Sequence, residues 1–121
     1  MSAALIADHL RSRGLLVDRA EDGRQALEMA CRLKPDLILM DMQMPALSGI
    51  DVTRRLRADG DRRISSVPIV ALTALSMSGD RERCLAAGAG AYLTKPVALA
   101  ELWRTVEELL GERPAALVDA K

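Results

Sequence analysis

Three side chains of different chemistry each come at the end of a short apolar segment of the chain. They are the carboxylate of Asp41, the hydroxyl of Thr73 and the ammonium group of Lys95. A carboxylate can attack phosphorus and form an acyl phosphate, while an ammonium group and a hydroxyl can contact phosphoryl oxygens. Each residue alone is weak evidence, because such side chains commonly cap helices or face solvent. If the fold brings them together, they make a site that handles a phosphoryl group.

The apolar segments predict a regular alternation of helices and strands. Strands are indicated at residues 15–20, 36–41, 67–72 and 92–94, and helices at residues 1–13, 24–34, 49–59, 79–87 and 99–110. Strict alternation with short loops is typical of parallel strands joined by right-handed helical crossovers. We therefore predict an α/β fold of three layers, with a parallel sheet of four strands between two layers of helices. Ligands of such sheets bind outside the carboxyl ends of the strands, which is where Asp41, Thr73 and Lys95 would lie.

Composition indicates one domain and excludes several classes of partner. The 121 residues carry 17 Lys+Arg and 17 Asp+Glu, so the net charge is +0, whereas a nucleic-acid binder normally has a basic excess. No apolar run approaches the ~20 residues that a bilayer requires, which argues against a membrane protein. Cys31 and Cys84 have no metal-ligand spacing and indicate reduced thiols in a cytoplasmic protein. We predict a domain over residues 1–112 and a flexible C-terminal tail over residues 113–121.

Several stretches of the sequence closely resemble the receiver domain of bacterial two-component response regulators. They run from Leu37 to Pro45 with Gly49, from Pro68 to Ala74, over Gly88-Ala89, and from Ala91 to Pro96. Their order and spacing are those of the family, and the resemblance covers residues 3 to 110. It implies a flavodoxin-like, CheY-like fold and a signalling domain.

The resemblance also implies a role for each residue of the site. Asp41 would be the phosphoacceptor, Thr73 the switch hydroxyl and Tyr92 the switch aromatic residue. Lys95 would contact the phosphoryl group, and its peptide bond to Pro96 would be cis.

The sequence departs from the family at its beginning. Family members start with a strand that ends in a pair of acidic residues, which hold Mg²⁺ beside the phosphoacceptor, but here Met1-Ser2-Ala3 already aligns with the first helix. The remaining implied Mg²⁺ ligands are Asp41 and the backbone carbonyl of Gln43. Because Mg²⁺ needs near-octahedral oxygen ligation, we expect it to bind weakly or not at all. For the same reason, we expect phosphorylation to be slow or absent.

The missing strand is the central one in the family's order 2-1-3-4-5. The receiver domain predicted over residues 1–112 is therefore truncated at its N-terminus, and the strands at residues 15–20 and 36–41 have unpaired facing edges. Three arrangements are left open: residues before Met1 in the natural protein, a sheet that closes up with the first helix relocated, or a second chain that supplies the missing surface. The last arrangement predicts a homodimer or a strand-completing partner.

Two functions from different classes fit this pattern. In a phosphorelay, a histidine kinase or phosphotransfer protein donates a phosphoryl group to Asp41, and Thr73 and Tyr92 then reposition to change a protein-interaction face. Alternatively, a degenerate receiver acts as an interaction or dimerisation module independently of phosphorylation, because the acidic pair is absent. In either case the chain is not an enzyme, beyond catalysing its own phosphorylation and dephosphorylation. A hydrolase with an aspartyl nucleophile would need a second acid two residues later, and position 43 is Gln.

Overall fold

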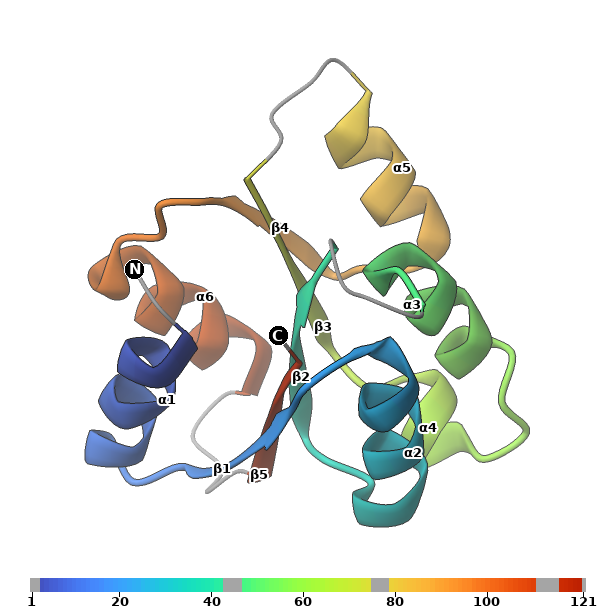
Figure 1. Cartoon of the computed structure of the whole chain (residues 1–121), viewed down its shortest axis with the longest axis horizontal. Coiled ribbons are helices and arrows are strands. Elements are labelled where there is room, and N and C mark those ends of the chain that lie inside the picture. The colour runs from blue at the N-terminus through green and yellow to red at the C-terminus, as the bar shows by residue number, and fades with distance from the viewer. Residues whose placement is uncertain (1–2, 43–46, 75–78, 111–115, 121) are drawn as a thin grey trace.

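A computed structural model of the chain describes residues 3–42, 47–74, 79–110 and 116–120 (Figure 1). The helices in these ranges are α1 (Ala3–Ser12), α2 (Gly23–Leu33), α3 (Gly49–Arg57), α4 (Arg62–Ser65), α5 (Asp80–Ala87) and α6 (Leu99–Leu110). The strands are β1 (Leu16–Ala20), β2 (Leu37–Asp41), β3 (Ile69–Thr73), β4 (Ala91–Thr94) and β5 (Ala116–Ala120).

The strands form one parallel sheet in the order β1-β5-β2-β3-β4. Helices α1 and α6 cover one face of this sheet, and α2, α3, α4 and α5 lie on the other side (Figure 1). The predicted three-layer, flavodoxin-like α/β fold is therefore confirmed. Helix α4 is additional, because the sequence pattern predicts no element at residues 62–65.

Strand β2 is buried on both faces and separates two hydrophobic cores. Its residues from Leu37 to Met40 are 0–1% exposed. Leu37 and Leu39 belong to the core under α1 and α6, whereas Ile38 and Met40 belong to the core under α2 and α3. A continuous apolar run is what burial on both faces requires, and it places the last residue of the strand, Asp41, at the carboxyl edge of the sheet.

The C-terminal segment forms a central strand, so the prediction of a flexible tail is wrong for residues 116–120. Strand β5 pairs with β1 from Leu16↔Ala116 to Ala20↔Ala120, and with β2 from Leu37↔Leu117 to Met40↔Ala120. The sheet consequently has five strands where the sequence predicts four. The chain's own last strand fills the gap between β1 and β2, an arrangement that differs from the three left open above. The open edges of two neighbours decide the conformation of this segment, and its local sequence does not show them.

Side-chain caps fix where the helices near the site begin. The Asp22 carboxylate accepts a hydrogen bond of 2.8 Å from the backbone N–H of Gln25 and so caps α2. The Ser48 hydroxyl accepts one of 3.2 Å from the N–H of Asp51 at the start of α3. Helix α2 follows the carboxyl end of β1 after residues 21–22, and α3 follows that of β2 after the longer connection of residues 42–48. Within the described ranges, no helix is both long and apolar enough to span a membrane.

Candidate functional site

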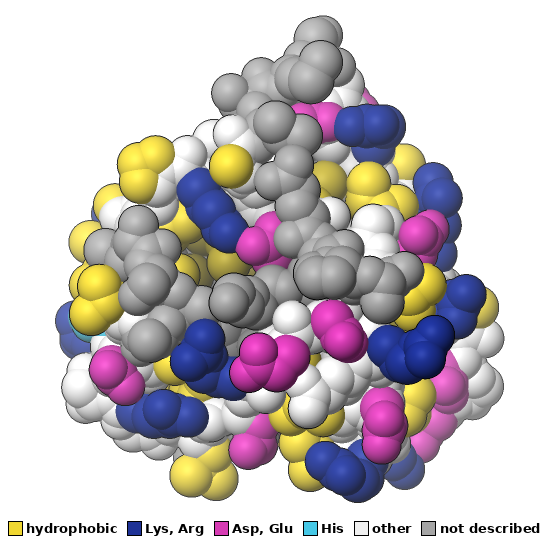
Figure 2. Space-filling view, in the orientation of Figure 1, with side chains coloured by type: hydrophobic (Ala, Val, Ile, Leu, Met, Phe, Trp, Pro, Cys, Tyr) yellow, Lys and Arg dark blue, Asp and Glu magenta, His cyan; other side chains and the backbone are white. Residues whose placement is uncertain are grey.

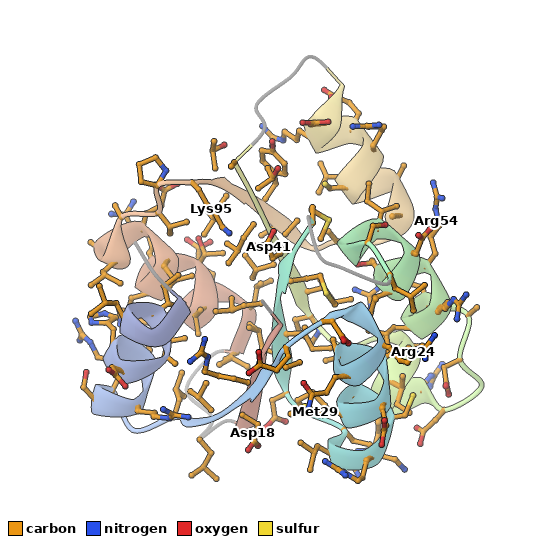
Figure 3. The ribbon with its side chains drawn as sticks, viewed as in Figure 1. Asp18, Arg24, Met29, Asp41, Arg54 and Lys95 are labelled. Carbon is orange, nitrogen blue, oxygen red and sulfur yellow. The ribbon has the colours of Figure 1, made fainter. Side chains whose placement is uncertain are left out.

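Asp41 and Lys95 meet at the carboxyl edge of the sheet. Asp41 is the last residue of β2, and Lys95 directly follows β4. The Lys95 ammonium group donates a hydrogen bond of 2.5 Å from Nζ to Oδ2 of Asp41. The Asp41 side chain is 13% exposed and the Lys95 side chain 34%, so the pair lies at the surface of the edge but is partly shielded from water. Figure 3 shows the two labelled side chains close together.

Thr73 lies between these two positions, at the end of the intervening strand β3. Asp41 is level with Leu72 in the β2–β3 register, so Thr73 is one residue further along. The Thr73 residue is 3% exposed, and its carbonyl accepts a hydrogen bond of 2.7 Å from the N–H of Lys95. The structure therefore brings the three predicted residues to one edge of the sheet, with Asp41 and Lys95 in direct contact.

Tyr92 and Pro96 flank Lys95 in the chain. Tyr92 is level with Ala71 in the β3–β4 register, and its half-buried ring packs against the core under α2 and α3. The Lys95–Pro96 peptide bond is cis. This bond lies in the connection between β4 and α6, immediately after the residue that contacts Asp41.

Close backbone packing holds the segment after Asp41. The N–H of Gly49 donates a hydrogen bond of 3.3 Å to the carbonyl of Met42, and the N–H of Met42 donates one of 2.9 Å to the carbonyl of Leu72. A Cβ atom at Gly49 would lie 2.5 Å from the carbonyl oxygen of Asp41. The resemblance singled out Gly49 by its position in a motif, and the structure gives the reason: the start of α3 touches the backbone of the candidate phosphoacceptor.

The described residues do not provide a complete set of metal ligands. No group of three or more His, Cys, Asp or Glu side chains among them is arranged to hold a cation, and Oδ2 of Asp41 is bonded to Lys95. Gln43, the other implied ligand, lies outside the described residues. Asp119 was not predicted as a site residue. It lies on β5 level with Leu39 of β2, and Leu39 is two residues before Asp41 in the chain. Without such a group of ligands among the described residues, and with Oδ2 of Asp41 bonded to an ammonium group, the site does not fit the oxygen-rich ligation that Mg²⁺ requires.

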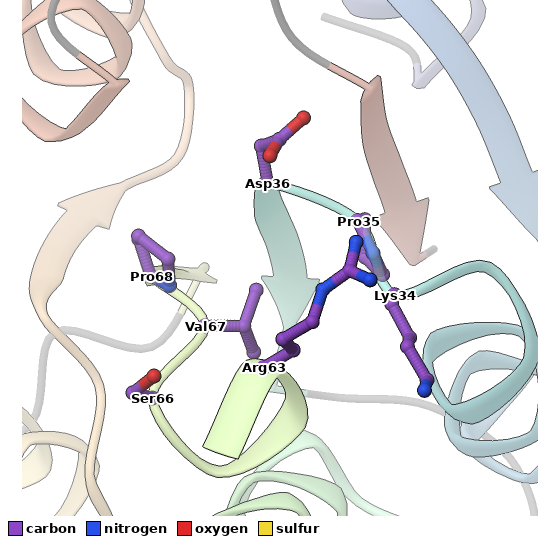
Figure 4. A pocket seen from close by; sticks show the side chains of 7 residues that line it. All are labelled: Lys34, Pro35, Asp36, Arg63, Ser66, Val67 and Pro68. Carbon is purple, nitrogen blue, oxygen red and sulfur yellow. The ribbon is translucent and has the colours of Figure 1, made fainter. Parts of the chain in front are cut away.

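The pocket shown in Figure 4 lies at the opposite edge of the sheet. It has a volume of about 290 Å³, and its lining residues are Lys34, Pro35, Asp36, Arg63, Ser66, Val67 and Pro68. Asp36 precedes β2 and Pro68 precedes β3, so the pocket opens at the amino ends of these strands. It is separate from the Asp41 site.

Charged side chains of both signs are interspersed over the face shown in Figure 2. No large patch of a single sign is visible there among the described residues. The distribution on this face agrees with the net charge of +0.

Comparison with known proteins identifies the family. The sequence profile of the response regulator receiver domain matches residues 1–107. The chain belongs to this family. The receiver domain is 37% identical to the polar-differentiation response regulator DivK of Brucella anthropi over 112 residues, which are 93% of this chain and 89% of that protein. The homologue from Brucella ovis has the same identity and coverage.

Solved structures agree with this assignment. The receiver domain of a sensor histidine kinase from Pseudomonas aeruginosa, crystallised with a magnesium ion in its active-site cleft, is 44% identical with a TM-score of 0.81, covering 90% of this chain and 88% of that one. A response regulator from Chloroflexus aurantiacus is 30% identical with a TM-score of 0.84, covering 91% and 88%. The chemotaxis protein CheY4 of Vibrio cholerae is 28% identical with a TM-score of 0.81, covering 89% and 88%.

Proposed function

We propose that this receiver domain accepts a phosphoryl group on Asp41 in a two-component phosphorelay. A carboxylate oxygen of Asp41 attacks the phosphorus of a phosphohistidine on a histidine kinase or phosphotransfer protein. The P–N bond breaks, the imidazole leaves, and an acyl phosphate forms on Asp41. The observation that carries this proposal is the convergence of Asp41, Lys95 and Thr73 at one edge of the sheet.

Each neighbouring side chain has a defined task in this proposal. The Lys95 ammonium group, which lies 2.5 Å from Asp41, would move with the new charge and pair with a phosphoryl oxygen. The Thr73 hydroxyl would donate to another phosphoryl oxygen. Tyr92 would follow Thr73, because the two residues lie on adjacent paired strands. The change would be presented on the surface formed by α5, β4 and α6, which binds the next protein of the relay.

The cation of the family would neutralise charge as the phosphoryl group is transferred. The described part of this chain has no group of three or more acidic, histidine or cysteine ligands at that place, so we expect weak Mg²⁺ binding and slow phosphorylation. A degenerate receiver that works without phosphorylation is the competing hypothesis, and it predicts no phosphorylation at all.

The test is incubation of the purified chain with acetyl phosphate, with and without Mg²⁺, followed by intact-mass analysis. We expect slow addition of one phosphoryl group, and none with Asp41→Asn. Asp36→Asn is the matched control, because Asp36 directly precedes the same strand at its other end. Trp103 packs against the core under α1 and α6, with its ring centroid 5.0 Å from the Arg13 guanidinium carbon, and so gives a fluorescence signal from α6. If neither acetyl phosphate nor a phosphorylated phosphotransfer protein modifies Asp41, the phosphorelay function is wrong.

A further inference from the structure

Strand β5 is the last strand in the sequence, yet it occupies an inner position of the sheet. It lies between β1 and β2, and only residues 111–115 connect it to α6. The elements from α1 to α6 follow one another along the chain without passing through β5. The strand can therefore leave its place while every other connection of the fold remains unbroken.

Departure of β5 would expose two strand edges at once. Strand β5 pairs with the backbone of β1 from Leu16 to Ala20 and with the backbone of β2 from Leu37 to Met40. Leu37 and Leu39, which are fully buried in the core under α1 and α6, would border the opened slot. Unpaired edges next to apolar side chains readily capture another strand, so a chain with an open slot would not remain open.

A second copy of the chain carries the strand that fits this slot. Residues 116–120 match the register of β1 on one side and of β2 on the other, and every copy has the same five residues. We propose that the slot between β1 and β2 is a strand-acceptor site, and that two copies exchange residues 116–120 reciprocally at high concentration. The exchange is closed and symmetric, because each copy donates one strand and accepts one.

The connection between α6 and β5 sets the concentration at which exchange occurs. Within one chain, a short connection holds the strand near its slot at an effective concentration in the millimolar range, as an order of magnitude. A second copy competes only when its own concentration approaches that range. The monomer with its own β5 in place therefore dominates when the protein is dilute.

Exchange leaves the Asp41 site of each copy intact. Asp41 is the register partner of Leu72 in β3, and the N–H of Met42 donates a hydrogen bond to the Leu72 carbonyl. Lys95 follows β4. Neither β3 nor β4 pairs with β5. The inference consequently does not depend on the proposed function, and a failure of one leaves the other standing.

Disulfide trapping in the full chain tests the exchange. Leu16 and Ala116 are register partners in adjacent strands, where Cα atoms are close enough to be bridged, and Leu16 is 72% exposed. The test variant carries Leu16→Cys and Ala116→Cys. Its two natural cysteines are replaced by Cys31→Ser and Cys84→Ala, so that only the introduced pair can form a bridge. Each single cysteine variant is the control for random collisions. After equilibration and mild oxidation, non-reducing electrophoresis and intact mass separate intrachain from interchain bridges.

We expect intrachain bridges at low micromolar concentration and a covalent dimer with two bridges as the major species near millimolar concentration. Deletion of Glu112 and Arg113 shortens the connection and should move dimer formation to lower concentration. Intrachain bridges alone at every concentration would overturn the exchange. Absence of any bridge from the double variant would overturn it as well, because β5 would then not occupy the slot.

Discussion

Nζ of Lys95 lies 2.5 Å from Oδ2 of Asp41, although the two residues are 54 positions apart in the chain. A second ion pair, in which Lys34 Nζ lies 2.7 Å from Asp61 Oδ2, is more open to water, with side chains 37% and 33% exposed. The strength of an ion pair depends on how far water screens it. The two pairs therefore provide a matched comparison within one protein.

We expect Lys95→Met to lower the free energy of unfolding by about 1–2 kcal/mol, because it leaves a partly buried carboxylate without its charged donor. The loss should be much smaller when Asp41→Asn is already present, since the charge that needs the donor is gone. Urea unfolding of the two single variants and the double variant measures this coupling.

The same cycle at Lys34 and Asp61 is the control, and its coupling should be smaller, because water screens this more exposed pair. Additive effects of the Asp41 and Lys95 substitutions would show that their contact contributes nothing to stability.

Gly49→Ala should damage the segment that carries Asp41. The added Cβ would lie 2.5 Å from the Asp41 carbonyl oxygen and 2.8 Å from the Met42 Cα atom, so backbone must move. We expect a loss of about 1–3 kcal/mol in the free energy of unfolding, together with slower phosphorylation of Asp41. Denaturant unfolding and the acetyl phosphate assay measure the two effects.

Gly60→Ala is the control for the Gly49 substitution, because a Cβ there has no neighbour within 4 Å. It should be neutral or stabilise the fold by roughly 0.4–1 kcal/mol, through a less flexible unfolded chain. If both variants unfold at the same denaturant concentration as the parent, the close approach at Gly49 is not a constraint.

The Asp61 carboxylate should contribute a pH-dependent part of the stability. Its pKa is lowered mainly by the hydrogen bond from Lys34, and further by the one from the backbone N–H of Arg63. Because the folded state lowers this pKa, the contribution is present above the unfolded-state pKa of about 3.9 and is lost as the pH falls through the folded-state value.

Asp61→Asn should thus cost some stability near neutral pH and less in acid, which unfolding curves at both conditions measure. An equal loss at the two pH values would mean that the charge of Asp61 is not responsible.

Apart from the short helix α4, the order of helices and strands up to residue 110 could be predicted from the sequence, because these segments carry local signals. Strand β2 reads as a continuous apolar run since both of its faces are buried. Helix α6 has its buried residues Leu102, Val106 and Leu110 at helical spacing. Alternation of such segments then fixes which ends of the strands share an edge, and so which side chains can meet.

The sequence by itself determined the α/β class, the parallel arrangement and the candidate residues at the strand ends. Only the tertiary structure decided that Lys95 contacts Asp41 and that residues 116–120 complete the sheet. The physical reason is the same for both. Lys95 lies 54 positions from Asp41, and the pairing partners of β5 lie 100 residues away on β1 and 80 residues away on β2. Contacts across such separations depend on register and on open strand edges, which exist only once the rest of the chain has folded.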